Sequence, residues 1–419
     1  MEILAVANIF NLSGVSVHIN NVLRELVKLG NEVEVLVPSF LVSNKIEVLK
    51  ELERNGVKVN SFTYDLINRG VVGKTSSYSY FLFSHLSTLE MSRISSIELN
   101  NIQNALKEMK PDIIYDMHED PITLKISYIA SKMSGAPIVK LLHDEPFRFS
   151  FGRGYRKITG FQGFVYDTLM YFFYKFDRRA YMKAIRDGKL RGVLAVSEAP
   201  VYLSKIDRLC ERFGVPLKVL KPGNAYNYDL ISKYRNLENK QDFAVFFARL
   251  VPQKGIRELP KIAKLLEPYK VIVFGKFANK SEETRFLNSI SSNVEYRGYR
   301  PIDELYSTVA KAKVVIYPSH QDGFSLVVLD SLALGTSVVA YDIPAIRFVY
   351  NGLEPVKIVK EYDINGMVMK ARSILQQDLS KYKAYHEDEK VKEFLNLHKS
   401  WEAVARQTEE FLRKIASMK

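Results

Sequence analysis

The stretch from Val314 to Asp330 constrains the fold more than any other part of the chain. Val314-Val315-Ile316-Tyr317 is a short apolar run that reads as a buried parallel strand. A turn of small residues follows, and an apolar helix begins near Leu326. A strand, a tight loop and a helix in this order predict an α/β sheet. Ligands of open α/β sheets bind at the carboxyl ends of strands, and a helix N-terminus there favours an anion such as a diphosphate.

Two carboxylates, Asp322 and Asp330, flank this turn eight positions apart. Asp330 shares its helical face with apolar residues three or four positions away, namely Leu326, Val327, Ala333 and Leu334. A carboxylate on an apolar face costs free energy unless it is paired or bonded to a polar group. Asp330 is therefore either a structural residue paired to a Lys or Arg, or a ligand for hydroxyl groups. We favour the second interpretation.

The same alternation of strand and helix runs along the chain in two series. Strands of the first series are predicted at Ile3–Ala7, Val33–Val37, Ile113–Tyr115, Ile138–Leu142 and Val193–Val196. Strands of the second are predicted at Ala244–Phe247, Val271–Phe274, Val294–Tyr296, Val314–Tyr317 and Val338–Ala340. Between the two series, residues 216–240 are polar and broken by Pro222-Gly223-Asn224. The sequence predicts two doubly wound, Rossmann-like α/β domains that face a cleft.

The expected boundaries follow from this break, and 419 residues suit two domains. Residues 1–220 are expected to form an N-terminal domain, and residues 221–386 a C-terminal domain. Residues 387–419 read as charged amphipathic helices, with the only tryptophan, Trp401. These helices are expected to pack back on the N-terminal domain.

Composition narrows the class of protein and of partner. The chain is 47% hydrophobic and carries a net charge of +13, so it is globular and favours anionic partners. Its single cysteine, Cys210, excludes an internal disulfide framework and fits a reducing compartment. The N-terminus lacks a basic n-region, and no apolar run approaches the ~18 residues of a transmembrane helix. We expect a cytoplasmic protein, with peripheral attachment to a membrane left open.

The segment 147–191 is unusually basic, with eleven Lys or Arg residues against three Asp, and aromatic residues are interleaved. Two interpretations stay open: an element that binds an anionic membrane surface, or a core helix with a solvated basic face. Nucleic acid is not expected, because no nucleic-acid motif accompanies the charge.

Other polar residues lie at predicted strand ends. Arg249 and Lys254 follow the strand Ala244–Phe247 and are candidates for phosphate binding, although two solvated surface charges would give the same pattern in the sequence.

His118 and His143 end neighbouring strands of the first series. Neither has a partner at metal-ligand spacing, so no metal site is predicted. Gly14 closes the first loop without a G-x-G-x-x-G pattern, so a nicotinamide fingerprint is absent.

Together these residues resemble the retaining glycosyltransferases of the GT-B fold, most closely glycosyltransferase family four (glycosyl transferases group 1). The likeness spans nearly the whole chain. Its motifs are Asp322-Gly323-Phe324-Ser325 with Asp330, Gly335 to Ala340, Ala248-Arg249-Leu250 with Lys254-Gly255, Ser13-Gly14, Ala195 to Glu198, and Trp401-Glu402. The family has glutamates at positions 322 and 330 and glycines at positions 248 and 325, so this chain departs from it at all four.

The resemblance implies that residues 1–220 form the acceptor-side domain and that residues 221–386 bind the nucleotide sugar. It also implies a role for each candidate residue. Arg249 and Lys254 would hold the donor diphosphate, helped by backbone amides of Gly14 and of Gly323, Phe324, Ser325 and Leu326. Asp322 would contact the donor sugar and Asp330 the ribose hydroxyls. The loop at Gly298 would meet the base, and His143 would lie beside the transferred sugar. The catalytic residues would be His143, Asp322, Arg249 and Lys254, with neither metal nor cofactor.

The function implied is transfer of a hexose, with retention, from a nucleoside diphosphate sugar to a glycan or lipid-linked acceptor. Two alternatives remain. The aspartates at positions 322 and 330 are compatible with a catalytically degenerate binding or regulatory module. A sugar-nucleotide epimerase on the same fold would turn over the donor without an acceptor.

Overall fold

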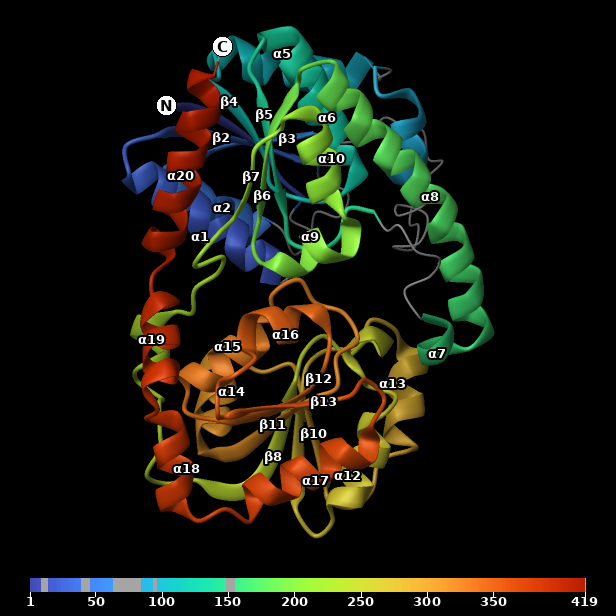
Figure 1. The fold of residues 1–419 in the computed structure, drawn as a ribbon, viewed down its shortest axis with the longest axis vertical. Coiled ribbons are helices and arrows are strands. Elements are labelled where there is room, and N and C mark those ends of the chain that lie inside the picture. The colour runs from blue at the N-terminus through green and yellow to red at the C-terminus, as the bar shows by residue number, and fades with distance from the viewer. Residues whose placement is uncertain (9–13, 39–45, 63–83, 93–95, 148–154, 419) are drawn as a thin grey trace. The chain divides into compact units, whose positions relative to one another are not determined.

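The computed structural model describes residues 1–8, 14–38, 46–62, 84–92, 96–147 and 155–418. The chain divides into two compact units, coloured in sequence order in Figure 1. The first unit comprises Met1–Gly152, Thr168–Asn224 and Trp401–Lys419. The second comprises Arg153–Asp167 and Ala225–Ser400. The chain therefore crosses between the units near residues 152, 167, 224 and 400.

The first unit is built on a seven-stranded parallel sheet in the order β3-β2-β1-β4-β5-β6-β7. Its strands are β1 (Glu2–Val6), β2 (Glu32–Pro38), β3 (Lys58–Phe62), β4 (Ile113–Asp116), β5 (Ile138–Leu142), β6 (Leu190–Ala195) and β7 (Leu217–Val219). The helices of this unit are α1 (Gly14–Lys28), α2 (Ile46–Arg54), η1 (Thr88–Glu90), α5 (Ser96–Glu108), α6 (Pro121–Ser134), α9 (Glu198–Ser204), α10 (Ile206–Phe213) and α20 (Trp401–Ser417). Helix α8 (Phe161–Arg186) begins in the second unit and continues into the first.

Helix α20 completes the core of the first unit. It packs on α1 and contacts β4 and β6. Gly192 permits this close packing, because a Cβ there would lie 2.9 Å from a ring carbon of Phe411. Phe411, Leu412 and Ile415 are buried. The last helix of the chain thus belongs to the same core as the first strand.

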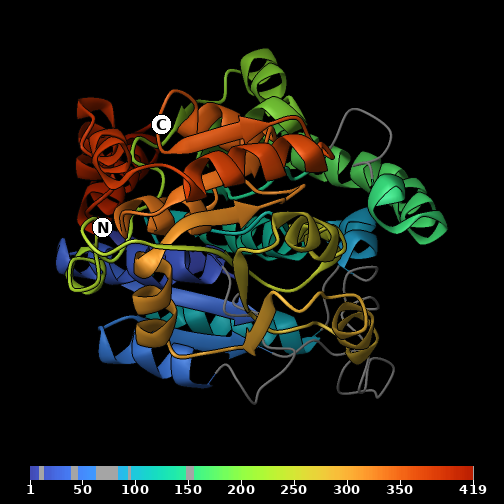
Figure 2. The same ribbon diagram turned by 90° about the horizontal axis from the view of Figure 1, so that it is seen from below.

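The second unit has a six-stranded parallel sheet in the order β10-β9-β8-β11-β12-β13. Its strands are β8 (Gln241–Phe247), β9 (Lys270–Phe274), β10 (Val294–Gly298), β11 (Ala312–Tyr317), β12 (Ser337–Tyr341) and β13 (Val356–Val359). Its helices are α7 (Tyr155–Thr159), α11 (Tyr228–Ile231), η2 (Pro252–Lys254), α12 (Leu259–Leu266), α13 (Lys280–Leu287), α14 (Ile302–Lys311), α15 (Leu326–Ala333), α16 (Pro344–Tyr350), α17 (Ile364–Leu375), α18 (Leu379–His386) and α19 (Glu389–Leu397). Helices cover both faces of the sheet, as two views show (Figures 1 and 2).

Each sheet reverses its strand order once, between β1 and β4 in the first unit and between β8 and β11 in the second. The loops that follow such a pair of strands diverge to opposite faces and leave a ligand-binding crevice. In the second unit, Arg249 follows β8 and the turn before Leu326 follows β11. The topology confirms the predicted fold class of two doubly wound α/β domains, while the cleft between them stays a prediction. Within the described helices, none has the length and apolarity to cross a membrane.

Candidate functional site

The turn after β11 is locked against η2 by backbone contacts. Gly255 has a φ of +77°, and a Cβ there would lie 2.2 Å from the carbonyl oxygen of Pro318. The amide of His320 also donates to the carbonyl of Gln253 at 2.9 Å. Only glycine at position 255 allows this approach. The segment that carries Lys254 and the turn that carries Asp322 are therefore held together as one structure.

Asp322 and Lys254 form an ion pair, with 2.6 Å between Nζ and Oδ1, and both side chains are mostly buried. Lys254 also donates to the carbonyl of Gln321 at 2.9 Å. The second oxygen of Asp322 accepts hydrogen bonds from the Tyr317 hydroxyl and from Ser319, the latter at 3.1 Å. Every one of these bonds orients a charge at the carboxyl end of β11.

Burial and charge act in opposite directions on this cluster. Burial lowers the pKa of Lys254, but the neighbouring Asp322 and Tyr317 raise it more, so the net shift is upward. Burial, followed by the charge of Asp322, raises the pKa of Tyr317 to about 12. Lys254 is thus a fixed cation and Tyr317 a fixed hydrogen-bond donor at neutral pH.

Ser325 stands at the N-cap of α15 in a left-handed conformation, with φ +73° and ψ 83°. Its carbonyl accepts a hydrogen bond from the Tyr350 hydroxyl at 2.7 Å. Phe324 packs edge-on against Tyr350, with 5.9 Å between ring centroids. The side chain of Phe324 is therefore part of the core, and only its backbone can contribute to binding at the helix N-terminus.

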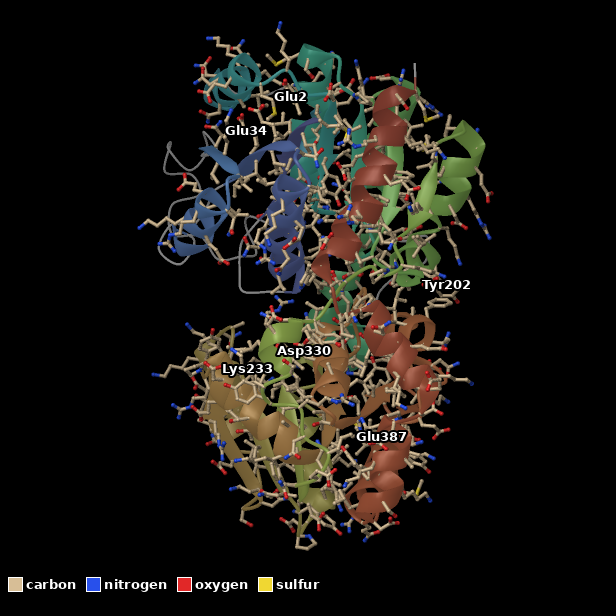
Figure 3. The ribbon with its side chains drawn as sticks, turned by 90° about the vertical axis from the view of Figure 1, so that its left-hand side faces the viewer. Glu2, Glu34, Tyr202, Lys233, Asp330 and Glu387 are labelled. Atoms are coloured by element: carbon tan, nitrogen blue, oxygen red, sulfur yellow. The ribbon has the colours of Figure 1, made fainter. Side chains whose placement is uncertain are left out.

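Asp330 lies on α15 and accepts a hydrogen bond from the Tyr306 hydroxyl at 2.8 Å (Figure 3). Burial raises the pKa of its carboxyl to about 7, and the bond from Tyr306 opposes that shift. Among the described residues, no Lys or Arg pairs with Asp330, so the structural ion-pair interpretation is not supported. A buried carboxylate with one neutral donor has capacity for further hydroxyl donors.

Arg249 and Gly298 lie at neighbouring strand ends. Arg249 is exposed after β8, close enough to Lys254 for its charge to lower that lysine's pKa slightly. Gly298 ends β10 with φ +71°, and its carbonyl accepts from the Gly275 amide at 3.0 Å. Gly275 in turn passes so near β8 that a Cβ would lie 2.1 Å from the carbonyl oxygen of Ala248. Glycine at position 275 therefore permits the close approach of the segment after β9 to the end of β8.

His320 is a residue to which the sequence analysis assigned no role. Its side chain is buried, and its two ring nitrogens contact Glu361 at 2.7 Å and Glu258 at 2.8 Å. Burial lowers the pKa of His320, but the two glutamates outweigh it, so the net shift is upward. The imidazole stacks on Tyr362, with 4.6 Å between ring centroids. His320 thus ties the turn after β11 to the segments after η2 and β13.

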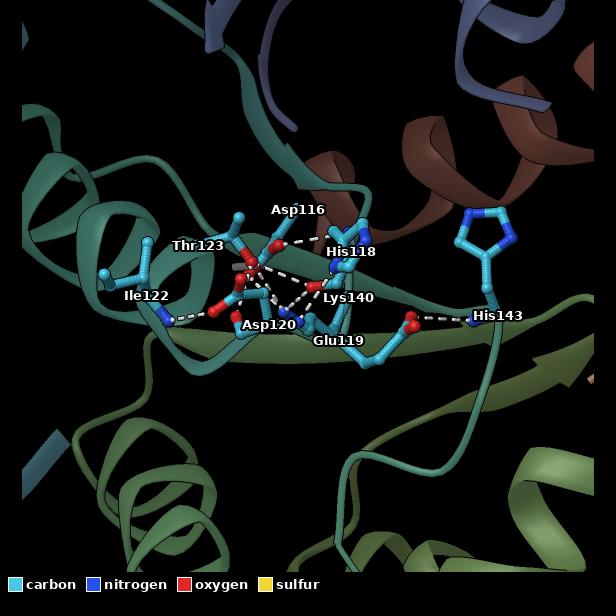
Figure 4. A network of polar contacts seen from close by, with 8 residues as sticks. All are labelled: Asp116, His118, Glu119, Asp120, Ile122, Thr123, Lys140 and His143. Carbon is cyan, nitrogen blue, oxygen red and sulfur yellow. Dashed lines mark hydrogen bonds and ion pairs between the residues drawn. The ribbon is translucent and has the colours of Figure 1, made fainter. Parts of the chain in front are cut away.

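In the first unit, His143 follows β5 and is buried, and its amide donates to Glu119 at 3.2 Å (Figure 4). Burial is the first cause that lowers the pKa of His143 well below its usual value, and the charges of His18 and His118 follow. His143 is therefore a neutral imidazole at physiological pH. His118 has a different role, because its Nδ1 accepts the Asp120 amide at 3.0 Å and closes a turn.

Beside His143 lies a fully buried ion pair between Lys140 and Asp116, at 2.7 Å (Figure 4). Lys140 also donates to the hydroxyl of Thr123 at 3.1 Å and to the carbonyl of His118. A lysine within an otherwise apolar strand was visible in the sequence, but its partners were not. The pair fixes the carboxyl ends of β4 and β5, where the loops of the first unit begin.

Gly14 opens α1, and His18, four residues further along that helix, meets His143 edge-on, with 4.6 Å between ring centroids. The structure thus brings Gly14 and His143 into one region of the first unit. Ser13, the other residue of that motif, lies outside the described residues, as do 148–154 of the basic segment.

The second unit holds the remaining candidate residues. They are Arg249, Lys254, Asp322 and the start of α15, with Asp330 further along α15 and Gly298 at the end of β10. No role was predicted for Tyr317, Tyr306, His320 and His18. Tyr317, His320 and His18 were signalled only by their position beside a predicted strand end or loop, and Tyr306, within α14, had no signal.

The second unit matches a known family. Residues 228–392 match the family described as glycosyl transferases group 1. An uncharacterized glycosyltransferase of Methanocaldococcus jannaschii is 30% identical over 121 residues, which cover 28% of this chain and 34% of that protein. The chain therefore spans about a third of that relative. TuaC of Bacillus subtilis, provisionally named as a teichuronic acid biosynthesis glycosyltransferase, is 25% identical over 84% of this chain and 83% of its own.

The fold of the whole chain matches a solved structure. HepE of Anabaena, in a crystal structure with UDP and glucose, superposes with a TM-score of 0.68 over 99% of this chain and 100% of HepE. Sequence identity is 16%, so this likeness shows the fold alone. The chain has the fold of GT-B glycosyltransferases, and residues 228–392 of its second unit are similar to the glycosyl transferases group 1 family.

Proposed function

We propose that the protein is a retaining glycosyltransferase that moves a hexose from a nucleoside diphosphate sugar to a glycan or lipid-linked acceptor. The observation that carries the proposal is the ion pair of Lys254 and Asp322 at the switch point of the second sheet. It places a fixed cation beside the N-terminus of α15, where a donor diphosphate would find positive charge.

The charges of this cluster suit the departure of a diphosphate. As the bond to the sugar breaks, negative charge grows on the diphosphate oxygen. Lys254 would stabilise this charge as a preorganised cation, and the exposed Arg249 would bind the phosphates through two parallel hydrogen bonds. Amides at the start of α15 would add their dipoles. With these groups the transfer needs neither a metal nor a cofactor, which forms part of the proposal.

Asp322 has a positioning role as well as a binding one. Its carboxylate already accepts from Lys254, Tyr317 and Ser319, so it holds the lysine in place. A carboxylate has about four lone-pair positions, which leaves capacity for one sugar hydroxyl.

The other candidate residues would bind the rest of the donor. Asp330 would bind the ribose and the loop at Gly298 the base. The Gly14 amide would help to bind the diphosphate, and His143 would lie beside the transferred sugar. Retention of configuration is implied by the resemblance.

The acceptor side includes a surface that fits a membrane. The outward face of α8 exposes Leu169 and Phe172 and, further along, Lys175, Arg179 and Lys183. Two acidic residues of the helix, Asp167 and Asp177, are buried, and Asp187 just after the helix pairs with Lys183 at 2.9 Å, so Lys175 and Arg179 carry the positive charge of that face. Arg179 and Lys183 line a pocket of about 560 Å³ together with Leu89 and Glu90. Apolar groups next to cations fit anionic lipid, so we propose that the protein binds a membrane peripherally.

A panel of nucleoside diphosphate sugars tests the transferase proposal. We expect one donor to raise the melting temperature and to be turned over with acceptor. Lys254→Ala should lower kcat/KM at least tenfold, about 1.4 kcal/mol. Lys261→Ala, an exposed lysine on α12, is the matched control and should retain activity. Folded protein that neither binds nor hydrolyses any donor would refute the proposal and leave the binding-module alternative.

The same assay separates the epimerase alternative, which predicts that the sugar changes without any acceptor. For the membrane, vesicles with anionic lipid should co-sediment the protein at low salt and release it at high salt. Leu169→Ser with Phe172→Ser should abolish sedimentation, whereas Tyr299→Ser, an exposed aromatic of the second unit, should not. Equal sedimentation with neutral and anionic vesicles would count against the membrane surface.

A further inference from the structure

His18 is a buried polar residue that the proposed chemistry does not use. It is the fifth residue of α1, and none of its surface is exposed. Burial lowers its pKa to about 4, so the ring is neutral. Its Nδ1 contacts the amide oxygen of Asn224 at 3.0 Å, which assigns the proton to Nδ1. Its Nε2 is buried and has no hydrogen-bond partner among the described residues.

The ring of His18 contacts the segment that leaves the first unit at Asn224 and the segment that re-enters it at Trp401. Asn224 is the last residue before the chain passes to the second unit, and Trp401 is the first after it returns. Trp401 meets His18 edge-on, with 5.6 Å between ring centroids and 85° between the planes. One side chain thus contacts two of the four points at which the chain crosses between the units, those at Asn224 and Trp401.

Both crossing points are also fixed to the first unit by other contacts. Gly223 passes so close to Val196 that a Cβ would lie 1.8 Å from its carbonyl oxygen. The amide of Lys221 donates to Gln407 of α20 at 3.1 Å, and the amide group of Gln407 donates back to the carbonyl of Lys221. The two chain segments are therefore hydrogen-bonded to each other within the first unit.

On its other side, His18 contacts His143, whose Nε2 is likewise buried without a described partner. We infer that His18 is a positioning residue that holds the ring of His143 and links it to both crossing segments at Asn224 and Trp401. The inference rests on the proposed function, because it takes His143 as the group beside the transferred sugar. A displacement of the chain at Asn224 or at Trp401 would therefore be transmitted to His143 through the ring of His18.

Kinetics in two backgrounds test this role. His18→Phe keeps a ring between Trp401 and His143 but removes the bond to Asn224. We expect it to lower kcat about tenfold while the donor KM stays within twofold. In a His143→Ala background the same substitution should have no further effect on kcat, because it acts through His143. A residue that only stabilises the fold would lower kcat by the same factor in both backgrounds, and that result would overturn the inference.

A second measurement does not depend on turnover. The ¹⁵N chemical shifts of the His143 ring should change in Asn224→Ala, which frees His18 to turn. Asn55→Ala, a partly exposed asparagine whose side-chain amide donates to the Glu51 carbonyl at 2.7 Å in the same unit, is the control and should leave them unchanged. Unaltered His143 shifts in Asn224→Ala would refute the coupling even in an active enzyme. Altered shifts in a protein without donor turnover would refute the transferase proposal but support the coupling.

Discussion

Ser325 shows how a single departure from a family motif takes structural form. The family has glycine at this position, and here a serine adopts φ +73°. A left-handed conformation costs an L-residue roughly 1–2 kcal/mol. We expect Ser325→Gly to raise the free energy of unfolding by at most ~1 kcal/mol, because glycine adopts this conformation without strain. The greater entropy of glycine in the unfolded chain offsets part of the gain. Chemical denaturation measures this. Ser325→Ala, which loses the hydroxyl but keeps the strain, should show no gain.

Asp330 predicts a pH dependence. Burial raises the pKa of its carboxyl from 3.8 to about 7. The folded state therefore holds this proton over a range in which the unfolded state has lost it. The resulting stabilisation is complete below about pH 4 and is lost as the pH rises through about 7. At pH 8 the ionised, buried carboxylate destabilises the ligand-free protein by at most ~4 kcal/mol.

Asp330→Asn removes this charge and tests both consequences. We expect the variant to be more stable than the parent at pH 8 and nearly equal to it at pH 4.5, as measured by urea unfolding. If the ionised carboxylate binds ribose hydroxyls, nucleoside diphosphate should bind the parent more tightly at pH 8 than at pH 6, by calorimetry. The variant should lose that difference. A parent whose affinity does not change with pH would contradict the assignment.

At the scale of single residues, the sequence revealed charged groups but not their partners. Asp322 and Lys254 could be predicted as neighbours because each follows a strand of one parallel sheet. Their hydrogen-bond donor Tyr317 and the Tyr306 partner of Asp330 were not predicted. Tyr306 is 24 positions from Asp330 and lies on another helix. Such a contact depends on how helices pack, which periodicity along the chain does not encode.

The buried pair of Lys140 and Asp116 joins two strands, so its energy belongs to the element scale. Lys140→Met would leave Asp116 as a buried, unpaired charge between β4 and β5. We expect a loss of about 3–5 kcal/mol in unfolding free energy. Adding Asp116→Leu should recover most of it, since an apolar pair of similar volume needs no compensation. A double variant no more stable than the single one would show that the charges are not the cause.

Strands were predicted well where they are buried on both faces and poorly at the sheet edges. β5 is buried at every position, and its predicted bounds were those of the structure. Three strands were not predicted, namely β3, β7 and β13. Each of them is an edge strand. Edge strands face solvent on one side, so they are shorter and more polar, and a search for apolar runs passes over them.

For the whole molecule, the sequence indicated two doubly wound domains because two series of strands were separated by one polar break. It did not indicate that residues Arg153–Asp167 cluster with the second unit. Residues 387–419 were expected to pack on the N-terminal domain; in the structure Trp401–Lys419 cluster with the first unit, whereas the residues before Trp401 cluster with the second. The packing of the final helix has the larger energetic consequence. The chain's final helix supplies Val404, Phe411, Leu412 and Ile415 to a core that begins at β1.

A chain that ends at Ser400 should therefore fail to fold its first unit. Each of those four side chains contributes about 1.5–3 kcal/mol by burial, so their loss is comparable to the whole stability of a typical domain, about 5–15 kcal/mol. We expect calorimetry to show one remaining unfolding transition, that of the second unit, where the full chain shows two or one merged transition. Lys414→Ala, an exposed residue of the same helix, should leave the full-length profile unchanged. If the shortened chain retained the transition of the first unit, the core of that unit would not need α20 for its stability. The contact of Trp401 with His18 would then not contribute to the folding of the first unit.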